Sequence, residues 1–106
     1  MSDIYNIDVI TVRSWLDANE AIIIDVREPN EYLEGHIEGA INIPLSGFAD
    51  QIEQIKNLSA KKIGKKIVLQ CKAGIRSMRA CQLLQEDGFA HDVWNLEGGI
   101  IAWQET

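Results

Sequence analysis

The sequence has few residues of the kinds that build disulfide-rich or metal-binding proteins. Only two cysteines, Cys71 and Cys81, occur among the 106 residues, too few for a disulfide framework. A zinc site needs four ligands at recognisable spacing, and neither His36 nor His91 has a cysteine or histidine close by in sequence. We therefore expect two free thiols, no metal and no other cofactor.

Long apolar runs and an excess of positive charge are missing as well. No segment approaches the length that spans a bilayer, and residues 1–3 do not begin a signal peptide, so we expect a cytoplasmic protein with no membrane partner. The net charge of −6 argues against nucleic acid as a main partner. The composition, 46% hydrophobic and 25% charged, is that of an ordinary soluble globular protein.

The chain has the common size of one domain, and no repeat, low-complexity tract or linker divides it. We therefore predict a single domain over residues 1–106. Four short apolar runs predict buried strands: Ile22–Ile24, Ala40–Ile43, Ile67–Leu69 and Val93–Leu96. Runs that are apolar on both faces are typical of parallel sheets, which helices cover on each side.

Helical patterns alternate with these strands. They comprise a helix capped by Thr11 and running through Asn19, a short one from Pro29 to Leu33, one whose face carries Phe48, Ile52 and Ile55, one with Ala80, Cys81 and Leu84 that stops at Gly88, and a terminal one containing Trp103. The alternation predicts an α/β fold with a mostly parallel central sheet of about five strands and helices on both faces.

Cys71 stands where a buried strand gives way to a tight basic turn that opens a helix. Backbone N–H groups and the positive end of that helix favour a thiolate, and Lys72, Arg76 and Arg79 could add to the effect. A thiol with the usual pKa of about 8.5 is roughly 3% ionised at pH 7, so a lowered pKa would make Cys71 a nucleophile. The alternative interpretations are a small buried hydrophobe at a strand end and a helix face that happens to be basic.

Several polar residues follow the ends of the predicted strands, namely Asp25 with Arg27, Asn42, Cys71, and Glu97 with Gly98 and Gly99. Ligands bind beyond the carboxyl ends of parallel strands, so we expect these segments to meet at one rim. For Asp25 and Arg27 we favour a supporting ion pair or turn bond over direct catalysis. The two glycines predict a tight strand-to-helix turn.

These residues resemble the motifs of a known family, the single-domain rhodaneses. The resemblance rests on Asp25-Val26-Arg27-Glu28 with Glu31-Tyr32, on Gly35-His36-Ile37-Glu38-Gly39-Ala40-Ile41-Asn42-Ile43-Pro44, on Cys71-Lys72-Ala73-Gly74-Ile75-Arg76-Ser77, and on Leu96-Glu97-Gly98-Gly99 through Trp103. The motifs occur in the same order as in the family and cover the chain from about residue 8 to its end.

The resemblance implies a thiosulfate sulfurtransferase-like enzyme. Cys71 would take the outer sulfur of thiosulfate or of another persulfide donor and pass it to an acceptor such as cyanide or a thiol. The N–H groups of Lys72, Ala73, Gly74, Ile75, Arg76 and Ser77 would stabilise the persulfide, and Lys72 and Arg76 would orient the anionic donor. The family motif gives His36 a scaffold role, and Cys81 is expected to pack in the core.

Two alternatives to an independent sulfurtransferase stay open. Cell-division-cycle dual-specificity phosphatases and arsenate reductases share this fold, but their loop between cysteine and arginine is one residue longer than the four residues that separate Cys71 from Arg76. The second alternative is a persulfide relay or a protein-binding module, in which Cys71 carries sulfur between proteins or the domain docks on a partner. The sequence leaves the physiological donor, the acceptor and the oligomeric state open.

Overall fold

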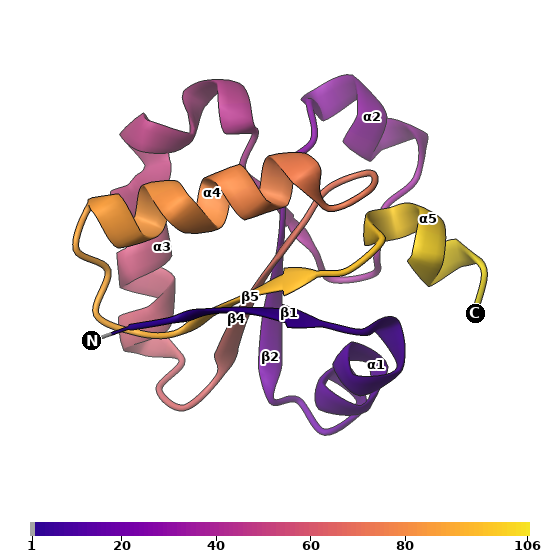
Figure 1. Ribbon diagram of the computed structural model, residues 1–106, viewed down its shortest axis with the longest axis horizontal. Helices are drawn as coiled ribbons and strands as arrows, with labels where there is room; N and C mark the ends of the chain where they lie inside the picture. The colour runs from indigo at the N-terminus through magenta and orange to yellow at the C-terminus, as the bar shows by residue number, and fades with distance from the viewer. Residues whose placement is uncertain (1) are drawn as a thin grey trace.

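Five parallel strands form one twisted sheet in the computed structural model, which describes residues 2–106 (Figure 1). The strands are β1 (Ile4–Ile7), β2 (Ala21–Asp25), β3 (Ile41–Asn42), β4 (Lys66–Gln70) and β5 (Val93–Leu96), in the spatial order β1-β5-β4-β2-β3. All neighbouring strands pair in parallel. The predicted α/β fold with a central parallel sheet is therefore confirmed.

Four α-helices connect consecutive strands: α1 (Val9–Asp17), α2 (Pro29–Glu34), α3 (Phe48–Lys61) and α4 (Ile75–Glu86). A fifth helix, α5 (Gly99–Gln104), follows β5. A short 3-10 turn, η1 (Leu45–Gly47), precedes α3. The prediction that Thr11 caps the first helix is wrong. Asp8 is the cap, and its carboxylate accepts the backbone N–H of Thr11 at 2.8 Å, which satisfies a donor that the first helical turn leaves free.

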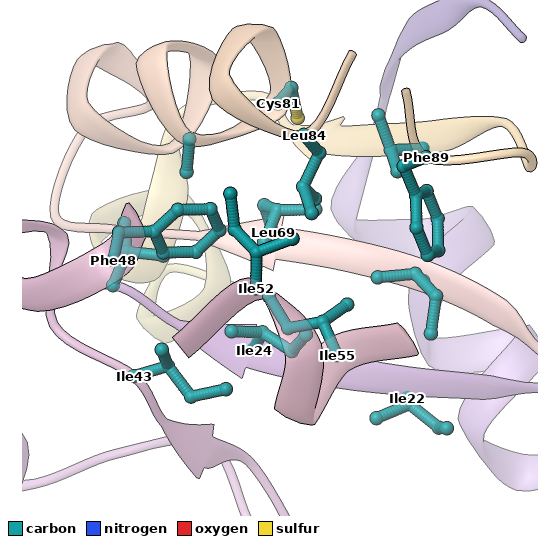
Figure 2. Packing of buried hydrophobic residues seen from close by; sticks show 14 of the residues in the cluster. Ile22, Ile24, Ile43, Phe48, Ile52, Ile55, Leu69, Cys81, Leu84 and Phe89 are labelled. Carbon is teal, nitrogen blue, oxygen red and sulfur yellow. The ribbon is translucent and has the colours of Figure 1, made fainter. Parts of the chain in front are cut away.

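Two apolar clusters fill the space on either side of the sheet because alternate residues of each strand point to opposite faces. Ile22 and Ile24 face α3 and α4, whereas Ile23 packs with α1 and α5 on the other face. Figure 1 shows α4 above the sheet and α1 below it. Figure 2 shows how Phe48, Ile52, Ile55 and Leu84 reach from α3 and α4 toward strand residues such as Leu69.

The two edge strands differ most from the sequence-based prediction. Residues 4–7 form β1, which was missed because its middle residues, Tyr5 and Asn6, are exposed and give no continuous apolar run. The predicted strand Ala40–Ile43 shrinks to the two residues of β3, which pairs only with β2. An edge strand has one partner, so tertiary pairing decides where it begins and ends.

The register of the central strands brings the predicted polar segments to one rim. Asp25, the last residue of β2, pairs with Gln70, the last residue of β4, and on its other side with Asn42 of β3. Cys71 follows Gln70 directly. The chain segments that leave the carboxyl ends of these strands therefore surround Cys71, as expected for an open parallel sheet.

Candidate active site

The sulfur of Cys71 lies inside a tight loop between β4 and α4. Its residue is 1% exposed, and Sγ accepts the backbone N–H of Gly74 at 3.0 Å and the hydroxyl of Ser77 at 3.3 Å. The loop closes around the sulfur because Gly74 takes a left-handed conformation with φ of 102°, which residues with a side chain rarely adopt. The loop residues Lys72, Ala73 and Ile75 remain exposed.

The hydrogen bonds to Cys71 favour its thiolate. Burial by itself raises the pKa of the thiol, but the hydroxyl of Ser77 and the backbone N–H groups of Ser77, Gly74 and Ala73 together lower the pKa below its ordinary value. These donors favour any sulfur anion at that position because they stabilise negative charge without having to rearrange. The arrangement can therefore hold a nucleophilic thiolate or a charged persulfide.

Helix α5 holds the loop from behind. The backbone N–H groups of Ile100 and Ile101 donate to the carbonyl oxygens of Cys71 and Lys72 at 2.9 and 3.2 Å. In a planar trans peptide the N–H points away from the carbonyl, so the N–H groups of Lys72 and Ala73 are turned away from α5. Gly99 permits this contact because a Cβ atom there would overlap both carbonyl groups.

Asn95, in the middle of β5, is a site residue that the sequence analysis missed. Its Nδ2 donates to the carbonyl of Gly74 at 3.1 Å, and its Oδ1 accepts the hydroxyl of Ser77 at 2.5 Å. Ser77 has a single hydroxyl hydrogen, which Asn95 and the sulfur of Cys71 both can accept. A buried polar residue within the apolar run Val93–Leu96 was the signal that could have revealed it.

The predicted cations around Cys71 have three different environments. Lys72 is exposed on the loop. Arg76 forms an ion pair with Glu31 of α2, whereas Arg79 pairs with Glu86 along the exposed side of α4. The hydrogen bond to Glu31 raises the pKa of Arg76, and the same bond lowers the pKa of Glu31 to about 2. Glu31 belongs to a motif quoted for the family resemblance, but its contact with Arg76 was not predicted.

Asp25 and Arg27 form the expected ion pair, at 2.8 Å between Oδ2 and Nη2, and both residues are buried. Arg27 also donates to the carbonyl oxygens of Gly35 and Glu31 at 2.7 and 3.3 Å. The side chain of Asn42 donates to the carbonyls of Asp25 and Arg27. These bonds fix the segment that carries α2, and through it they position Glu31 beside the loop.

Cys81 and His36 lie outside the cysteine loop. Cys81 is a fully buried free thiol that packs in the core between α3, α4 and the sheet, and burial raises its pKa to about 12. His36 stacks on Tyr32 with ring centroids 3.8 Å apart.

Within residues 2–106, no group of three or more His, Cys, Asp or Glu side chains could hold a metal ion. None of the described helices is long and apolar enough to cross a membrane.

A parallel sheet with a cysteine cradled by backbone N–H groups at its carboxyl rim defines a class of cysteine-loop α/β domains. The model of the family described as rhodanese-like domain matches residues 9–106 of this chain. The chain belongs to the rhodanese-like domain family, as the motifs indicated.

Individual relatives support the family assignment. The chain is 39% identical over 92 residues to tRNA uridine(34) hydroxylase of Salmonella arizonae, with 87% of this chain and 26% of that protein covered. It therefore spans about a quarter of the length of the curated relatives it matches. The human single-domain sulfurtransferase TSTD1 superposes with a TM-score of 0.77 at 27% identity, covering 95% of this chain and 96% of that one.

A protein from Staphylococcus saprophyticus has a similar structure over almost its whole length. The TM-score is 0.76 at 31% identity, and the match covers 93% of this chain and 92% of that one. Both structural relatives are therefore similar to this chain in fold and in extent.

Proposed function

We propose that this protein is a sulfurtransferase that carries sulfane sulfur as a persulfide on Cys71. The observation that carries the proposal is the pair of hydrogen bonds donated to Sγ of Cys71 by the N–H of Gly74 and the hydroxyl of Ser77. A site of that kind stabilises a sulfur anion before and after transfer. Membership of the rhodanese-like family and the similarity to a human single-domain sulfurtransferase support the same function.

In the first half-reaction, the Cys71 thiolate attacks the outer sulfur of a small anionic donor such as thiosulfate. A new S–S bond forms on Cys71, the S–S bond of thiosulfate breaks, and sulfite leaves with the electron pair. The loop from Lys72 through Ala73, Gly74, Ile75 and Arg76 to Ser77 is the proposed substrate-binding segment. Its N–H groups stabilise the transferred sulfur, and the positive charges of Lys72 and Arg76 orient the anionic donor.

In the second half-reaction, a thiol or cyanide attacks the outer sulfur of the Cys71 persulfide. The S–S bond breaks, and the Cys71 thiolate is regenerated with its hydrogen bonds in place. Because each half is a displacement at sulfur, in which the nucleophile supplies the electron pair of the new bond and the leaving group takes that of the old one, the cycle needs no cofactor. Asp25 and Arg27 take a supporting role, since their ion pair fixes the segment beside the loop.

A second candidate is a persulfide relay, in which the same chemistry passes sulfur between proteins. The observation that favours it is that the chain matches only a 26% share of a longer tRNA uridine(34) hydroxylase, so the same fold also occurs as one part of a larger protein. We place either function in a reducing compartment such as the cytoplasm, because both cysteines are free thiols.

Intact-mass spectrometry after thiosulfate treatment tests the proposal. We expect one added sulfur atom, located on Cys71, which cyanide removes as thiocyanate. The Cys71→Ser variant should gain no sulfur although its fold is intact. The matched control, Cys81→Ala, should keep most of the rate because Cys81 is buried in the core.

Two further assays separate the alternatives. Sulfur transfer from a cysteine desulfurase with no transfer from thiosulfate to cyanide would favour the relay. Efficient hydrolysis of an aryl phosphate, lost in Cys71→Ser, would overturn the sulfurtransferase proposal in favour of a phosphatase. We expect no such hydrolysis because the four residues between Cys71 and Arg76 make this loop one residue shorter than that of the phosphatases, and a shorter loop should form a cradle better matched to a single sulfur atom than to a phosphate group.

A further inference from the structure

Arg76, the loop cation expected to bind an anionic donor, is already engaged by a carboxylate. Its Nη1 and Nη2 donate to the two carboxylate oxygens of Glu31 at 2.6 and 2.9 Å. This two-point geometry is the strongest that arginine makes with a carboxylate. The two side chains are 34% and 27% exposed, so the pair is partly shielded from water. A donor that needs the charge of Arg76 must compete with Glu31.

Glu31 is held in this position by a second set of bonds. Its Oε1 also accepts the backbone N–H of Glu28 at 3.0 Å, and its own carbonyl accepts Nη1 of Arg27 at 3.3 Å. The side chain is therefore anchored to the first turn of α2, and the backbone of the same residue is anchored to Arg27 of the buried Asp25–Arg27 pair. The Glu31 carboxylate cannot move away from Arg76 without losing its bond to the N–H of Glu28 as well.

The surroundings of the loop carry charges of both signs. A groove of about 260 Å³ adjoins the loop and is lined by the carboxylates of Glu31 and Glu34 and by Lys72 and Arg27, of which Arg27 is already paired with the buried Asp25. The same groove is bordered by Ile101, which is 43% exposed, and the loop residue Ile75 is 81% exposed. Exposed apolar side chains on the loop and at the border of this groove fit a donor that carries an organic group.

We propose that Glu31 determines donor specificity by occupying Arg76, so that the site takes sulfur from an organic persulfide in preference to thiosulfate. This inference rests on the proposed function and names the substrate class for it. The Cys71 thiolate attacks the terminal sulfur of R–S–SH, the donor S–S bond breaks, and the thiolate R–S⁻ leaves with the electron pair. The proton stays on the sulfur now bound to Cys71. An organic persulfide presents at most one negative charge at its sulfur, whereas thiosulfate presents two.

The test compares thiosulfate with glutathione persulfide as donors, with the sulfur loaded on Cys71 measured by intact mass in single turnovers. In Glu31→Gln the amide oxygen can still accept the N–H of Glu28, but the variant lacks the negative charge that faces Arg76. We expect the second-order loading rate for thiosulfate to rise about tenfold and that for glutathione persulfide to change less than about twofold. The matched control is Glu34→Gln, which removes a charge from the same helix and groove but not from Arg76.

The faster loading by thiosulfate in Glu31→Gln must depend on Arg76. We expect Arg76→Gln to load more slowly with thiosulfate, and we expect Glu31→Gln to bring little gain when it is added to Arg76→Gln. A gain of the same size in the presence and absence of Arg76 would show that Glu31 acts only as a diffuse charge, and would overturn the inference.

A measurement on the unmodified protein does not depend on the folding of any variant. Salt screens repulsion between thiosulfate and the carboxylates at the loop, so raising the ionic strength from about 20 to about 200 mM should speed loading by thiosulfate. Slower loading at higher salt, or equal effects of Glu31→Gln and Glu34→Gln, would overturn the inference while the proposed function stands. If neither donor loads Cys71 in the wild type, the proposed function itself fails.

Discussion

The backbone N–H of Ile100 donates a hydrogen bond of 2.9 Å to the carbonyl oxygen of Cys71, which ties the start of α5 to the residue that carries the sulfur. Nε2 of Gln70 donates to the same carbonyl at 2.8 Å. Because this carbonyl is bound behind the loop, the N–H of Lys72 in the same peptide unit points to the side of the loop away from α5. The terminal helix is therefore part of the architecture that keeps the loop donors oriented.

Gly99→Ala should disrupt this contact. A Cβ at position 99 would overlap the carbonyl groups of Cys71 and Lys72, and the φ of 58° is unfavourable for alanine. We expect a loss of about 3 kcal/mol in the free energy of unfolding and loss of sulfur transfer. Urea unfolding and single-turnover loading would measure the two effects.

Gly88→Ala provides the control for that substitution. Gly88 also has a positive φ, of 82°, but no atom lies within 4 Å of its Cβ position. Alanine there should cost about 1 kcal/mol from the backbone conformation alone and leave sulfur transfer unchanged. Equal losses in the two variants would contradict the role assigned to the contact between Gly99 and the loop.

Ser77→Ala should raise the pKa of Cys71, because the variant lacks the hydroxyl that donates to the sulfur while burial still disfavours the thiolate. The pH dependence of Cys71 alkylation by iodoacetamide measures this pKa, and its midpoint should move to higher pH. Ser46→Ala removes a hydroxyl that bonds only to Glu28 at the surface, and its midpoint should match the wild type. An unchanged midpoint in Ser77→Ala would mean that the backbone N–H donors alone lower the pKa of Cys71.

Arg27→Met should leave Asp25 buried without its partner. Asp25 is fully buried and Arg27 is 6% exposed, so we expect a loss of about 3 to 5 kcal/mol in the free energy of unfolding. Lys56→Met breaks an ion pair with Asp87 whose side chains are 37% and 44% exposed, and it should cost less than about 1 kcal/mol. Chemical denaturation of both variants would show whether burial sets this difference.

Glu31 should contribute to the acid stability of the protein. Its pKa falls from 4.5 to about 2 on folding, mainly through the hydrogen bond to Arg76, so the folded state favours the charged carboxylate. This contribution is complete above the unfolded pKa and is lost as the pH falls through the folded one. The difference in stability between wild type and Glu31→Gln should therefore shrink between about pH 5 and about pH 2. A constant difference across that range would contradict the ion pair with Arg76.

The central part of the fold was predictable because its signals are local. Continuous apolar runs identified β2, β4 and β5, and apolar spacing identified the helices that carry Phe48 and Leu84. The edge strands β1 and β3 were missed or overextended. A strand with one partner and one solvated side takes its limits from pairing, which the residues themselves do not encode.

The sequence by itself determined that Cys71 ends a buried strand and begins a helix-opening loop, because strand, glycine and helix signals all lie within a few residues of it. Only the tertiary structure decided what surrounds the sulfur. Asn95 reaches Ser77 through the pairing of β4 with β5, and Glu31 reaches Arg76 through the placement of α2. These contacts join residues far apart in the chain, and hydrogen bonds of a few ångströms form only after the sheet register and the helix packing have brought their partners together.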